Sequence, residues 1–362
     1  MKLIKSALVS SLMAAASFGA CAQTTINGAG STFAYPIYTK WAKEYAKDTN
    51  VQINYQGVGS GAGIRAIESK TVDFGATDAP LTAAQLKEKH LVQWPAVMGA
   101  TVMAINVPGI KPGELRLSGP VIADIYLGKI KKWNDPAIVA LNKEAIKKGE
   151  FKLPNHTIYV VHRSDGSGTT FNFTEYLDQV SPTWHKKIGF AKSVSWPKEA
   201  INLGGKGNAG VANDVTRTPY SIGYVEYAYA KETGLTYTAM KNRDGKYLEP
   251  SMKTFQAAAS NADWKHAPGY YLLLNNQPGA ESWPMTAATF ILVQKDPKNP
   301  ERTKDVIKFY NWAYSEGSKA AESLSYVPMP QNLINMVRKT WQNDITHDGK
   351  QVITAKTLAS TK

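Results

Sequence analysis

The sequence contains almost no cysteine, which limits both how the protein can be stabilised and which chemistry it can perform. Cys21 is the only cysteine among 362 residues, so the chain can form no intramolecular disulfide and offers no thiolate cluster to a metal. Its six histidines occur in no metal-binding spacing such as H-E-x-x-H. A chain of this length can bury sizeable hydrophobic cores, so we expect packing alone to provide the stability, without a metal or other cofactor.

Long apolar runs are also missing, because no stretch reaches the roughly 18 apolar residues that suggest a membrane-spanning helix. The chain begins instead with "MKLIKSALVSSLMAAASFGACAQ", in which lysines precede a short apolar part and the small residues Ala20, Cys21 and Ala22. This pattern is typical of a secretory signal peptide, and we predict that residues 1–22 are removed on export. The minor alternative is a degenerate lipoprotein signal in which Cys21 carries a lipid anchor.

Arginine-rich runs and nucleic-acid-binding motifs are absent too, although the net charge of the whole chain is +13. Loss of Lys2 and Lys5 with the signal peptide leaves 40 basic and 29 acidic residues, a net charge of about +11. The lysines are spread along the chain rather than gathered in one block. We therefore predict a solvated basic surface that mildly attracts anions, and no nucleic-acid partner.

Helical and extended apolar patterns alternate along the rest of the chain, which is typical of an α/β protein. "VQINYQGV" and "TVDFGAT" have the pattern of strands, Thr82 and Gln85 form a predicted capping box, and "MTAATFILVQK" is a late apolar strand. The helical patterns after this last strand have no sheet of their own, so we expect them to pack on the N-terminal unit. The chain is then predicted to cross twice between two lobes, near residues 100–107 and 286–294.

Three glycine-containing segments share one layout, in which glycines lead to serine or threonine and then to a helical pattern. They are "NGAGSTF" at 27–33, "GVGSGAG" at 57–63 and "RSDGSGTTF" at 163–171. A helix start carries unpaired backbone N–H groups and a partial positive charge, so it can hold an anion, and glycines let the main chain approach a ligand. Further donors are the hydroxyl groups of Ser31, Thr32, Ser60, Ser167 and Thr169.

Each of these segments also has a simpler interpretation. A serine or threonine at a helix start often serves only as an N-cap, and glycines often serve only tight turns. Arg163 can present a forked pair of donors to an oxyanion or form a salt bridge with Asp165, and an aspartate that orients the guanidinium still leaves donors for a ligand. Three similar segments together with this arginine favour an anion site over three separate caps.

Asp78 follows an apolar strand in "DFGATDAPL" and has two possible roles. It can be a turn or capping carboxylate. In an anion site, an ionised carboxylate accepts a hydrogen bond from phosphate, which still carries a proton near neutral pH, and it repels sulfate, which carries none. In the second role, Asp78 selects between two anions of similar shape.

The sequence signatures of enzymes fit poorly. Neither Ser60 nor Ser167 lies in G-x-S-x-G, and "GGKGN" lacks the spacing of a Walker loop. His162 alternates with Arg163 in a predicted strand, so its side chain should point the opposite way and serve packing or the surface. We therefore predict that the protein is not an enzyme, and a secreted serine-type phosphoester hydrolase is the less favoured alternative.

The chain closely resembles the periplasmic phosphate-binding proteins of bacterial high-affinity ABC phosphate importers. The resemblance rests on "GAGSTFAYPIYTKWA", "NYQGVGSGAGIRAI", "TVDFGATDAPL", "DGSGTTFNFTEYL", "NLGGKGNAGVA" and "SIGYVEYAYA", which occur in the order found in that family. It implies a two-lobed class II periplasmic-binding-protein fold with a ligand cleft and two hinge crossovers. With the crossovers above, lobe I is predicted to comprise residues 23–102 and 287–362, and lobe II residues 103–286. The resemblance further implies a monomeric periplasmic protein that binds inorganic phosphate, delivers it to a membrane permease and catalyses no reaction.

The resemblance also assigns the residues that bind phosphate. They are Ser31, Thr32, Phe33, Ser60, Asp78, Arg163, Ser167, Gly168 and Thr169, and Asp165 supports the arginine. The sequence departs from the family at Gly61 and Ala62, where many relatives carry a second serine and a glycine, and at His162, where relatives can have a second basic residue. These departures bear on affinity more than on the identity of the ligand. A binding protein for another oxyanion, such as sulfate or molybdate, is the remaining alternative.

Overall fold

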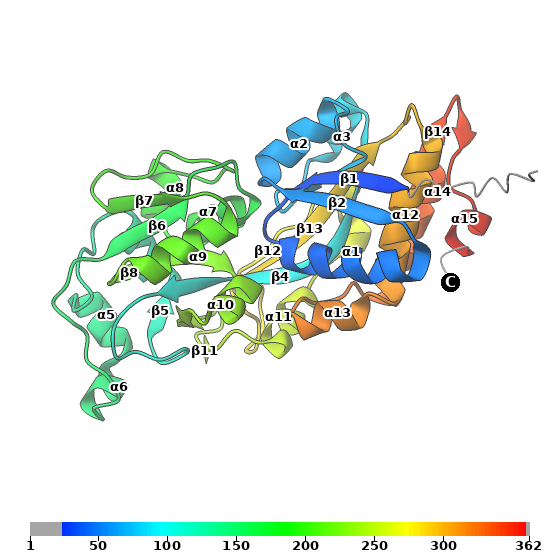
Figure 1. The fold of residues 1–362 in the computed structure, drawn as a ribbon. Coiled ribbons are helices and arrows are strands. Elements are labelled where there is room, and N and C mark those ends of the chain that lie inside the picture. Colours follow the sequence, from blue (N-terminus) through cyan, green and yellow to red (C-terminus); the bar gives the residue numbers. More distant parts are fainter. Residues whose placement is uncertain (1–23, 360–362) are drawn as a thin grey trace, which may run out of the picture.

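The computed structural model describes residues 24–359 of the chain, so the predicted signal peptide and Cys21 lie outside the described residues. Figure 1 shows two lobes, with the beginning and the end of the described chain in the same lobe. Helices and strands alternate along most of the sequence, and the fold is the predicted two-lobed α/β architecture.

The N-terminal third of the chain forms most of the strands of lobe I. On helix α1, the buried side chains Ile37, Trp41 and Tyr45 recur at helical spacing, as the sequence indicates. The predicted capping box is present, because Thr82 Oγ1 accepts from the Gln85 N–H and Gln85 Oε1 accepts from the Thr82 N–H. The elements are β1 (Thr25–Gly30), α1 (Tyr35–Thr49), β2 (Gln52–Gly57), α2 (Ser60–Glu68), β3 (Phe74–Thr77), α3 (Ala83–Lys89) and β4 (Leu91–Ile105).

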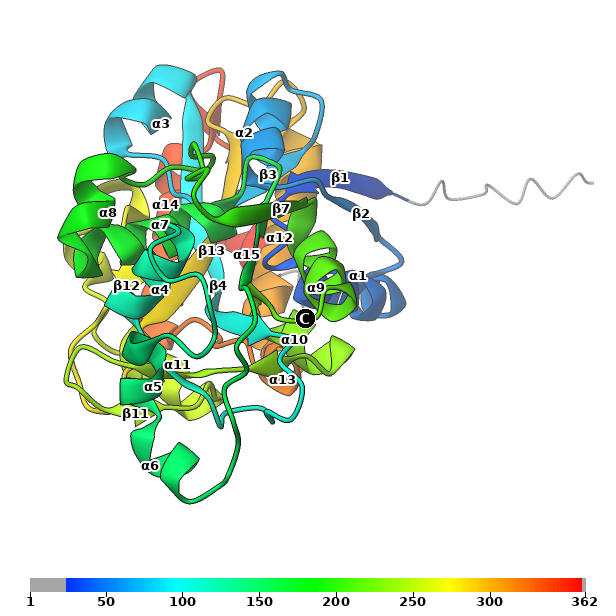
Figure 2. The same cartoon turned by 90° about the vertical axis from the view of Figure 1, so that its left-hand side faces the viewer.

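The middle of the chain contributes most of lobe II, whose central strands β6, β7 and β8 are parallel, although Gly269 and Tyr270 bond to Gln93 and Thr340 of lobe I. Figure 2 views the molecule from this end, with α7 to the left and α9 to the right of strand β7. The elements are β5 (Arg116–Ser118), α4 (Gly119–Tyr126), α5 (Pro136–Leu141), α6 (Lys143–Lys147), β6 (Tyr159–Arg163), α7 (Gly168–Val180), α8 (Pro182–Lys187), β7 (Ile201–Gly205), α9 (Gly207–Arg217), β8 (Ser221–Glu226), α10 (Tyr227–Thr233), β9 (Thr236–Tyr237), β10 (Ala239–Lys241), β11 (Tyr247–Leu248), α11 (Met252–Ala259), the 3-10 turns η1 (Trp264–His266) and η2 (Pro268–Tyr270), and β12 (Leu274–Asn275).

The last third of the chain returns to lobe I. Its helices pack on the N-terminal unit, as predicted, since the Tyr310 ring lies 5.5 Å from that of Phe74 and the Trp341 ring lies 5.4 Å from that of Trp94. Such aromatic contacts bury large apolar areas and fix the helices on the sheet. The elements are β13 (Met285–Gln294), α12 (Pro300–Ser315), α13 (Ser318–Ser323), α14 (Gln331–Asp344), β14 (Thr346–His347), β15 (Lys350–Gln351) and α15 (Ala355–Ala359).

One ten-stranded sheet extends through both lobes, with the central order β2-β1-β3-β13-β4-β8-β6-β7. Strand β4 changes its partner on the way, because it pairs with β13 up to Ala100 and with β8 from Thr101 onward. This change lies within the first predicted crossover. We retain 23–102 with 287–362 as lobe I and 103–286 as lobe II as a proposal for the exact bounds.

Within residues 24–359, the structure contains no helix that combines the length and the apolar character needed to cross a bilayer.

Candidate functional site

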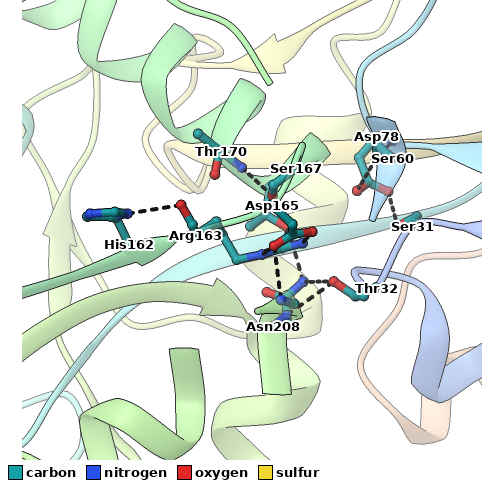
Figure 3. Close-up of polar contacts among 12 residues, drawn as sticks. Ser31, Thr32, Ser60, Asp78, His162, Arg163, Asp165, Ser167, Thr170 and Asn208 are labelled. Carbon is teal, nitrogen blue, oxygen red and sulfur yellow. Dashed lines mark hydrogen bonds and ion pairs between the residues drawn. The ribbon is translucent and has the colours of Figure 1, made fainter. Parts of the chain in front are cut away.

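The three glycine-containing segments meet where the two lobes face each other. Lobe I contributes the turn after β1, the start of α2 and the residue after β3, and lobe II contributes the turn between β6 and α7 (Figure 3). The backbone of these segments is in direct contact, because Gly61 N–H donates to the Gly166 carbonyl at 2.8 Å. The structure therefore brings the predicted segments together in a closed arrangement of the lobes.

Asp78 is the centre of the lobe I half of the site. Its Oδ1 accepts from Ser31 Oγ at 2.5 Å and from Thr289 Oγ1 at 2.6 Å, and Ser60 Oγ lies 3.3 Å from Oδ2. The side chain is almost fully buried. Burial raises the pKa of Asp78 to about 6, although the three hydroxyl donors and the charge of Arg163 each lower it. Asp78 is therefore mostly ionised at neutral pH and titrates just below it.

Ser31 serves Asp78 and has no donor left for a ligand. Its hydroxyl donates to Asp78, and its backbone N–H donates to the Ala76 carbonyl at 2.9 Å. A phosphate or sulfate oxygen mainly accepts hydrogen bonds, so Ser31 can act on such a ligand only through Asp78. The structure thus gives Ser31 a different role from the direct contact expected from the sequence.

Arg163 and Asp165 form the charged part of the lobe II half. Arg163 Nε lies 2.7 Å from Asp165 Oδ1, and Nη2 lies 2.5 Å from Oδ2, so the pair is bidentate. Burial raises the pKa of Asp165, but the hydrogen bonds and charge of Arg163 outweigh it and hold the pKa below its ordinary value. Nη1 also donates to Thr169 Oγ1 at 3.3 Å. Within the described chain, one N–H of each terminal nitrogen remains without a protein acceptor, so the salt bridge and ligand binding are compatible.

Helix α7 begins in the site, and Ser167 is its N-cap. Ser167 Oγ accepts from the Thr170 N–H at 2.9 Å, which leaves the Ser167 hydroxyl proton for another acceptor. The N-cap interpretation fails for the other two segments, because the N-caps of α1 and α2 are Ala34 and Gly59, without side-chain caps. Of the three segments, only the one with Ser167 therefore combines a side-chain helix cap with a hydroxyl proton that is still available to an anion.

Gly168 lies directly against the Asp78 carboxylate. A Cβ atom at this position would lie 2.4 Å from Ser60 Oγ and 2.5 Å from Asp78 Oδ2. Real Cβ atoms do not approach other atoms so closely, so only glycine allows the first turn of α7 to reach lobe I in this arrangement.

Asn208 joins the two halves of the site, and the sequence analysis missed it. Its Nδ2 donates to Thr32 Oγ1 at 2.9 Å and to Thr169 Oγ1 at 3.0 Å, and its backbone N–H donates to Thr32 Oγ1 at 3.1 Å (Figure 3). The signal for this residue was the strand-to-helix segment "GGKGN", which we tested as a Walker loop and counted in the family resemblance but did not assign to the anion site.

Asn208 also determines which hydroxyl protons stay free to be donated. The oxygen of Thr32 accepts two N–H groups from Asn208, and the oxygen of Thr169 accepts from Arg163 and Asn208. Each hydroxyl is thereby left with its own proton to donate. Further donors without a protein acceptor in the described chain are the backbone N–H groups of Thr32, Phe33, Ser60, Gly168 and Thr169.

Two further hydrogen bonds hold the lobes together around the site. Asn172 Nδ2 donates to the Asp78 carbonyl at 2.6 Å, and the Tyr229 hydroxyl donates to the Thr32 carbonyl at 2.6 Å. Neither residue was identified from the sequence, because each bonds to the main chain of a segment that is distant in the sequence.

The remaining predicted residues take different positions. Phe33 is fully buried, so its contribution to a ligand is limited to its backbone N–H, while its carbonyl accepts from Tyr326. His162 points away from the site, as expected, and its ring stacks on Trp196 with the centroids 4.6 Å apart. In the part of the chain that the structure describes, no imidazole contacts Ser60 or Ser167: the Ser60 hydroxyl donates to Asp78, and the Ser167 oxygen accepts from the Thr170 N–H.

A pocket of about 210 Å³ lies at the rim of the site. Thr32 and Asp165 lie on its wall, together with Tyr35, Val58 and Lys206. Residues 24–359 contain no cluster of three or more His, Cys, Asp or Glu side chains that could hold a metal ion. The arrangement provides many hydrogen-bond donors, one forked cation and one buried carboxylate, which suits a small oxyanion that carries a proton.

The fold and the site define a two-lobed anion-binding protein of the periplasmic-binding-protein class. A model of the PBP superfamily domain matches residues 15–317. The chain is 50% identical over 327 residues to the phosphate-binding protein PstS of Pasteurella multocida. This match covers 90% of this chain and 92% of that protein. It is also 50% identical over 321 residues to PstS of Haemophilus influenzae, with coverage of 89% and 93%.

A solved structure of a phosphate-binding protein from Stenotrophomonas maltophilia shares the fold, with a TM-score of 0.66 and 18% identity over 87% of this chain and 93% of that one. The 50% identity to two PstS proteins over about 90% of each chain shows that the chain belongs to the PstS family of phosphate-binding proteins.

Proposed function

We propose that the protein binds one inorganic phosphate ion between its lobes and delivers it to the membrane permease of an ABC importer. The observation that carries the proposal is the pairing of Asp78, a buried proton acceptor, with Arg163, a forked cation, in one donor-rich site. Phosphate near neutral pH needs both, because it is an anion and still has a proton to donate. The names of the relatives support the same ligand.

The proposed ligand contacts follow from the donors that the protein leaves without an acceptor. Thr32, Ser167 and Thr169 donate hydroxyl protons, and the first turn of α7 and the turn after β1 donate backbone N–H groups. Arg163 neutralises charge, and Asp78 accepts the phosphate proton. Ser31, Asp165 and Asn208 position these groups.

The protein acts, on this proposal, in the periplasm after removal of residues 1–22, as a monomer and without catalysis. Closure of the lobes around phosphate creates the form that the permease recognises. The membership of the chain in a family of binding proteins supports a role in capture rather than turnover.

Titration calorimetry of the full mature chain with phosphate, sulfate and molybdate at pH 7.5 tests the proposal. We expect tight one-to-one binding of phosphate and weak or no binding of the other two anions. Tighter binding of sulfate or molybdate would refute the assignment. Turnover of a chromogenic phosphate ester that Ser167→Ala abolishes would instead support the hydrolase.

A further inference from the structure

Glu226 is a fully buried carboxyl group that the proposed site does not use. It is the last residue of β8 and pairs with Thr101, the residue at which β4 changes its partner from β13 to β8. Glu226 therefore lies at the first crossover between the lobes. It also caps α10, because its Oε2 accepts from the Ala228 N–H at 2.8 Å.

The proton count around Tyr326 indicates that Glu226 is protonated. The Tyr326 hydroxyl lies 2.6 Å from the Phe33 carbonyl oxygen and 2.9 Å from Glu226 Oε2. A tyrosine has one proton to donate, and a carbonyl can only accept, so the shorter contact uses the Tyr326 proton. The longer contact is then a hydrogen bond only if Glu226 carries a proton and donates it to the tyrosine oxygen.

The surroundings of Glu226 agree with a neutral group. Its Oε1 is buried without a partner in the described chain, which is unfavourable for an ionised carboxylate. The titratable groups that face it are Tyr227, Tyr229 and Glu232 of α10 and Tyr326 of lobe I. Burial raises the pKa of Glu226 well above its ordinary value, and the nearby Glu232 adds to this.

Lys231 is the neighbouring cation on α10, but it does not neutralise Glu226. Its Nζ donates to Ser325 Oγ at 3.1 Å and lies over the Tyr227 ring. The carboxyl group is thus left among tyrosines and a second acid.

Glu226 connects to both halves of the ligand site. Through Tyr326 it holds the Phe33 carbonyl, which belongs to the turn after β1 whose N–H groups face the ligand. Its backbone N–H donates to Asn208 Oδ1 at 2.9 Å and so orients the amide that bonds Thr32 and Thr169. One residue at the crossover therefore touches a supporting group on each side of the cleft.

We propose that Glu226 is a protonated carboxylic acid that positions the lobe I half of the ligand site through its partner Tyr326, while its backbone N–H orients Asn208 in the lobe II half. Only the binding measurements described below rest on the proposed function, and the protonation of Glu226 does not. Glu226 does not touch the ligand and is a positioning residue.

Infrared difference spectroscopy of the phosphate-free protein tests the proton directly. The spectrum of the wild type minus that of Glu226→Gln at pH 7.5 should contain the C=O stretching band of a protonated carboxylic acid. Asp78, whose pKa is raised to about 6, is mostly ionised at this pH and is present in both proteins. A carboxylate band in place of the acid band would overturn the proposal.

Phosphate calorimetry tests the positioning role. Glu226→Gln keeps a neutral group that can donate to Tyr326, so its affinity should stay within about threefold of the wild type, whereas Glu226→Ala and Tyr326→Phe should weaken binding about five- to tenfold. The losses of the last two variants should not add in the double variant, because both remove the same bond. Glu232→Ala, an exposed change on the same helix, is the control and should bind as the wild type does.

The outcomes separate this inference from the proposed function. If the wild type binds no phosphate, the function is refuted, while the infrared result still decides the protonation of Glu226. If the wild type binds phosphate and Glu226→Gln is as weak as Glu226→Ala, the neutral-donor role is refuted. If Tyr326→Phe binds phosphate as tightly as the wild type, the proposed positioning of Phe33 by Tyr326 is refuted. The infrared spectrum and the thermal unfolding curve of this variant show whether it is folded.

Discussion

Nδ2 of Asn208 in lobe II lies 2.9 Å from Thr32 Oγ1 in lobe I, and the same amide lies 3.0 Å from Thr169 Oγ1. Because both oxygens accept from the amide, each threonine keeps its hydroxyl proton for the proposed ligand. We expect Asn208→Ala to weaken phosphate binding about tenfold or more, because both hydroxyls lose an N–H group that fixes their orientation. Calorimetry measures the loss, and Asn335→Ala on the exposed face of α14 is the control. Equal affinities of the two variants would contradict the role of Asn208.

The close approach of α7 to Asp78 predicts an unusual sensitivity at one glycine. Gly168→Ala should abolish tight phosphate binding, with a loss of about a hundredfold, because its Cβ would overlap Ser60 Oγ and Asp78 Oδ2 and keep the lobes apart. Small-angle scattering with phosphate should show no compaction of this variant.

Gly166→Ala provides the matched control in the same loop. The added Cβ would meet the backbone of Gly61 at ordinary contact distances, 3.4 Å from its Cα and 3.8 Å from its N. We expect this variant to bind phosphate and to compact as the wild type does. If both variants bind normally, closure does not require the contact seen here.

Arg163 is the buried cation of the site, so its removal should reduce affinity more than the loss of any single hydroxyl. Arg163→Ala is expected to weaken phosphate binding by about a hundredfold, because the ligand then loses a charge-assisted contact and Asp165 remains close by. Arg163→Lys should recover little of the lost phosphate affinity, since lysine cannot form the forked pair with Asp165. Exposed Arg243→Ala is the control, and near-native affinity of Arg163→Ala would refute the assignment.

The carboxylate of Asp78 should determine selectivity rather than affinity alone. In Asp78→Asn the repulsion of a fully deprotonated anion is gone, so sulfate should bind and the preference for phosphate over sulfate should fall about tenfold or more. Competition calorimetry with both anions measures this ratio. Exposed Asp244→Asn should leave the ratio unchanged. A preserved ratio in Asp78→Asn would rule out Asp78 as the selective group.

The same carboxylate predicts a pH dependence of selectivity. The pKa of Asp78 is raised to about 6, so the group is charged above this pH and becomes neutral as the pH falls through it. The preference for phosphate over sulfate should therefore decrease more between pH 7.5 and pH 5 in the wild type than in Asp78→Asn, in which only the protonation of phosphate itself changes.

Ser31→Ala should shift the pH at which the preference for phosphate over sulfate decreases. Removal of the Ser31 hydroxyl takes away a hydrogen bond that lowers the pKa of Asp78, so the midpoint should shift to higher pH. Ser260→Ala, on the surface, should leave the midpoint in place. An unchanged midpoint in Ser31→Ala would show that the hydroxyl does not stabilise the charged form.

Those parts of the fold and site that depend on local sequence could be predicted. The helix starts at Thr82 and Ser167 follow from capping residues and the helical spacing beside them. The strands follow from short apolar runs between turn residues. The glycine segments could be identified because their layout, in which glycines lead to serine or threonine and then to a helical pattern, is visible in the local sequence.

The supporting residues could not be predicted, because their partners are distant in sequence. Thr289 donates to Asp78 across 211 positions, and Asn208 donates to Thr32 across 176. In the sequence Thr289 is one polar residue in an apolar strand, and nothing local indicates its acceptor. The role of Ser31 was unpredictable for a related reason, since the direction of a hydroxyl proton depends on which acceptors the fold brings near it.

The place of β13 in the sheet also governs the order in which the protein can fold. β13 lies between β3 and β4 in the sheet, although β4 ends at Ile105 and β13 begins only at Met285, about 180 residues later. A chain that emerges from its amino end therefore presents β3 and β4 long before the strand that joins them exists. Lobe II, whose residues are contiguous on the proposed bounds, can complete its strands first. The half of the ligand site that carries Asp78 becomes complete only when Thr289 arrives, near the end of synthesis.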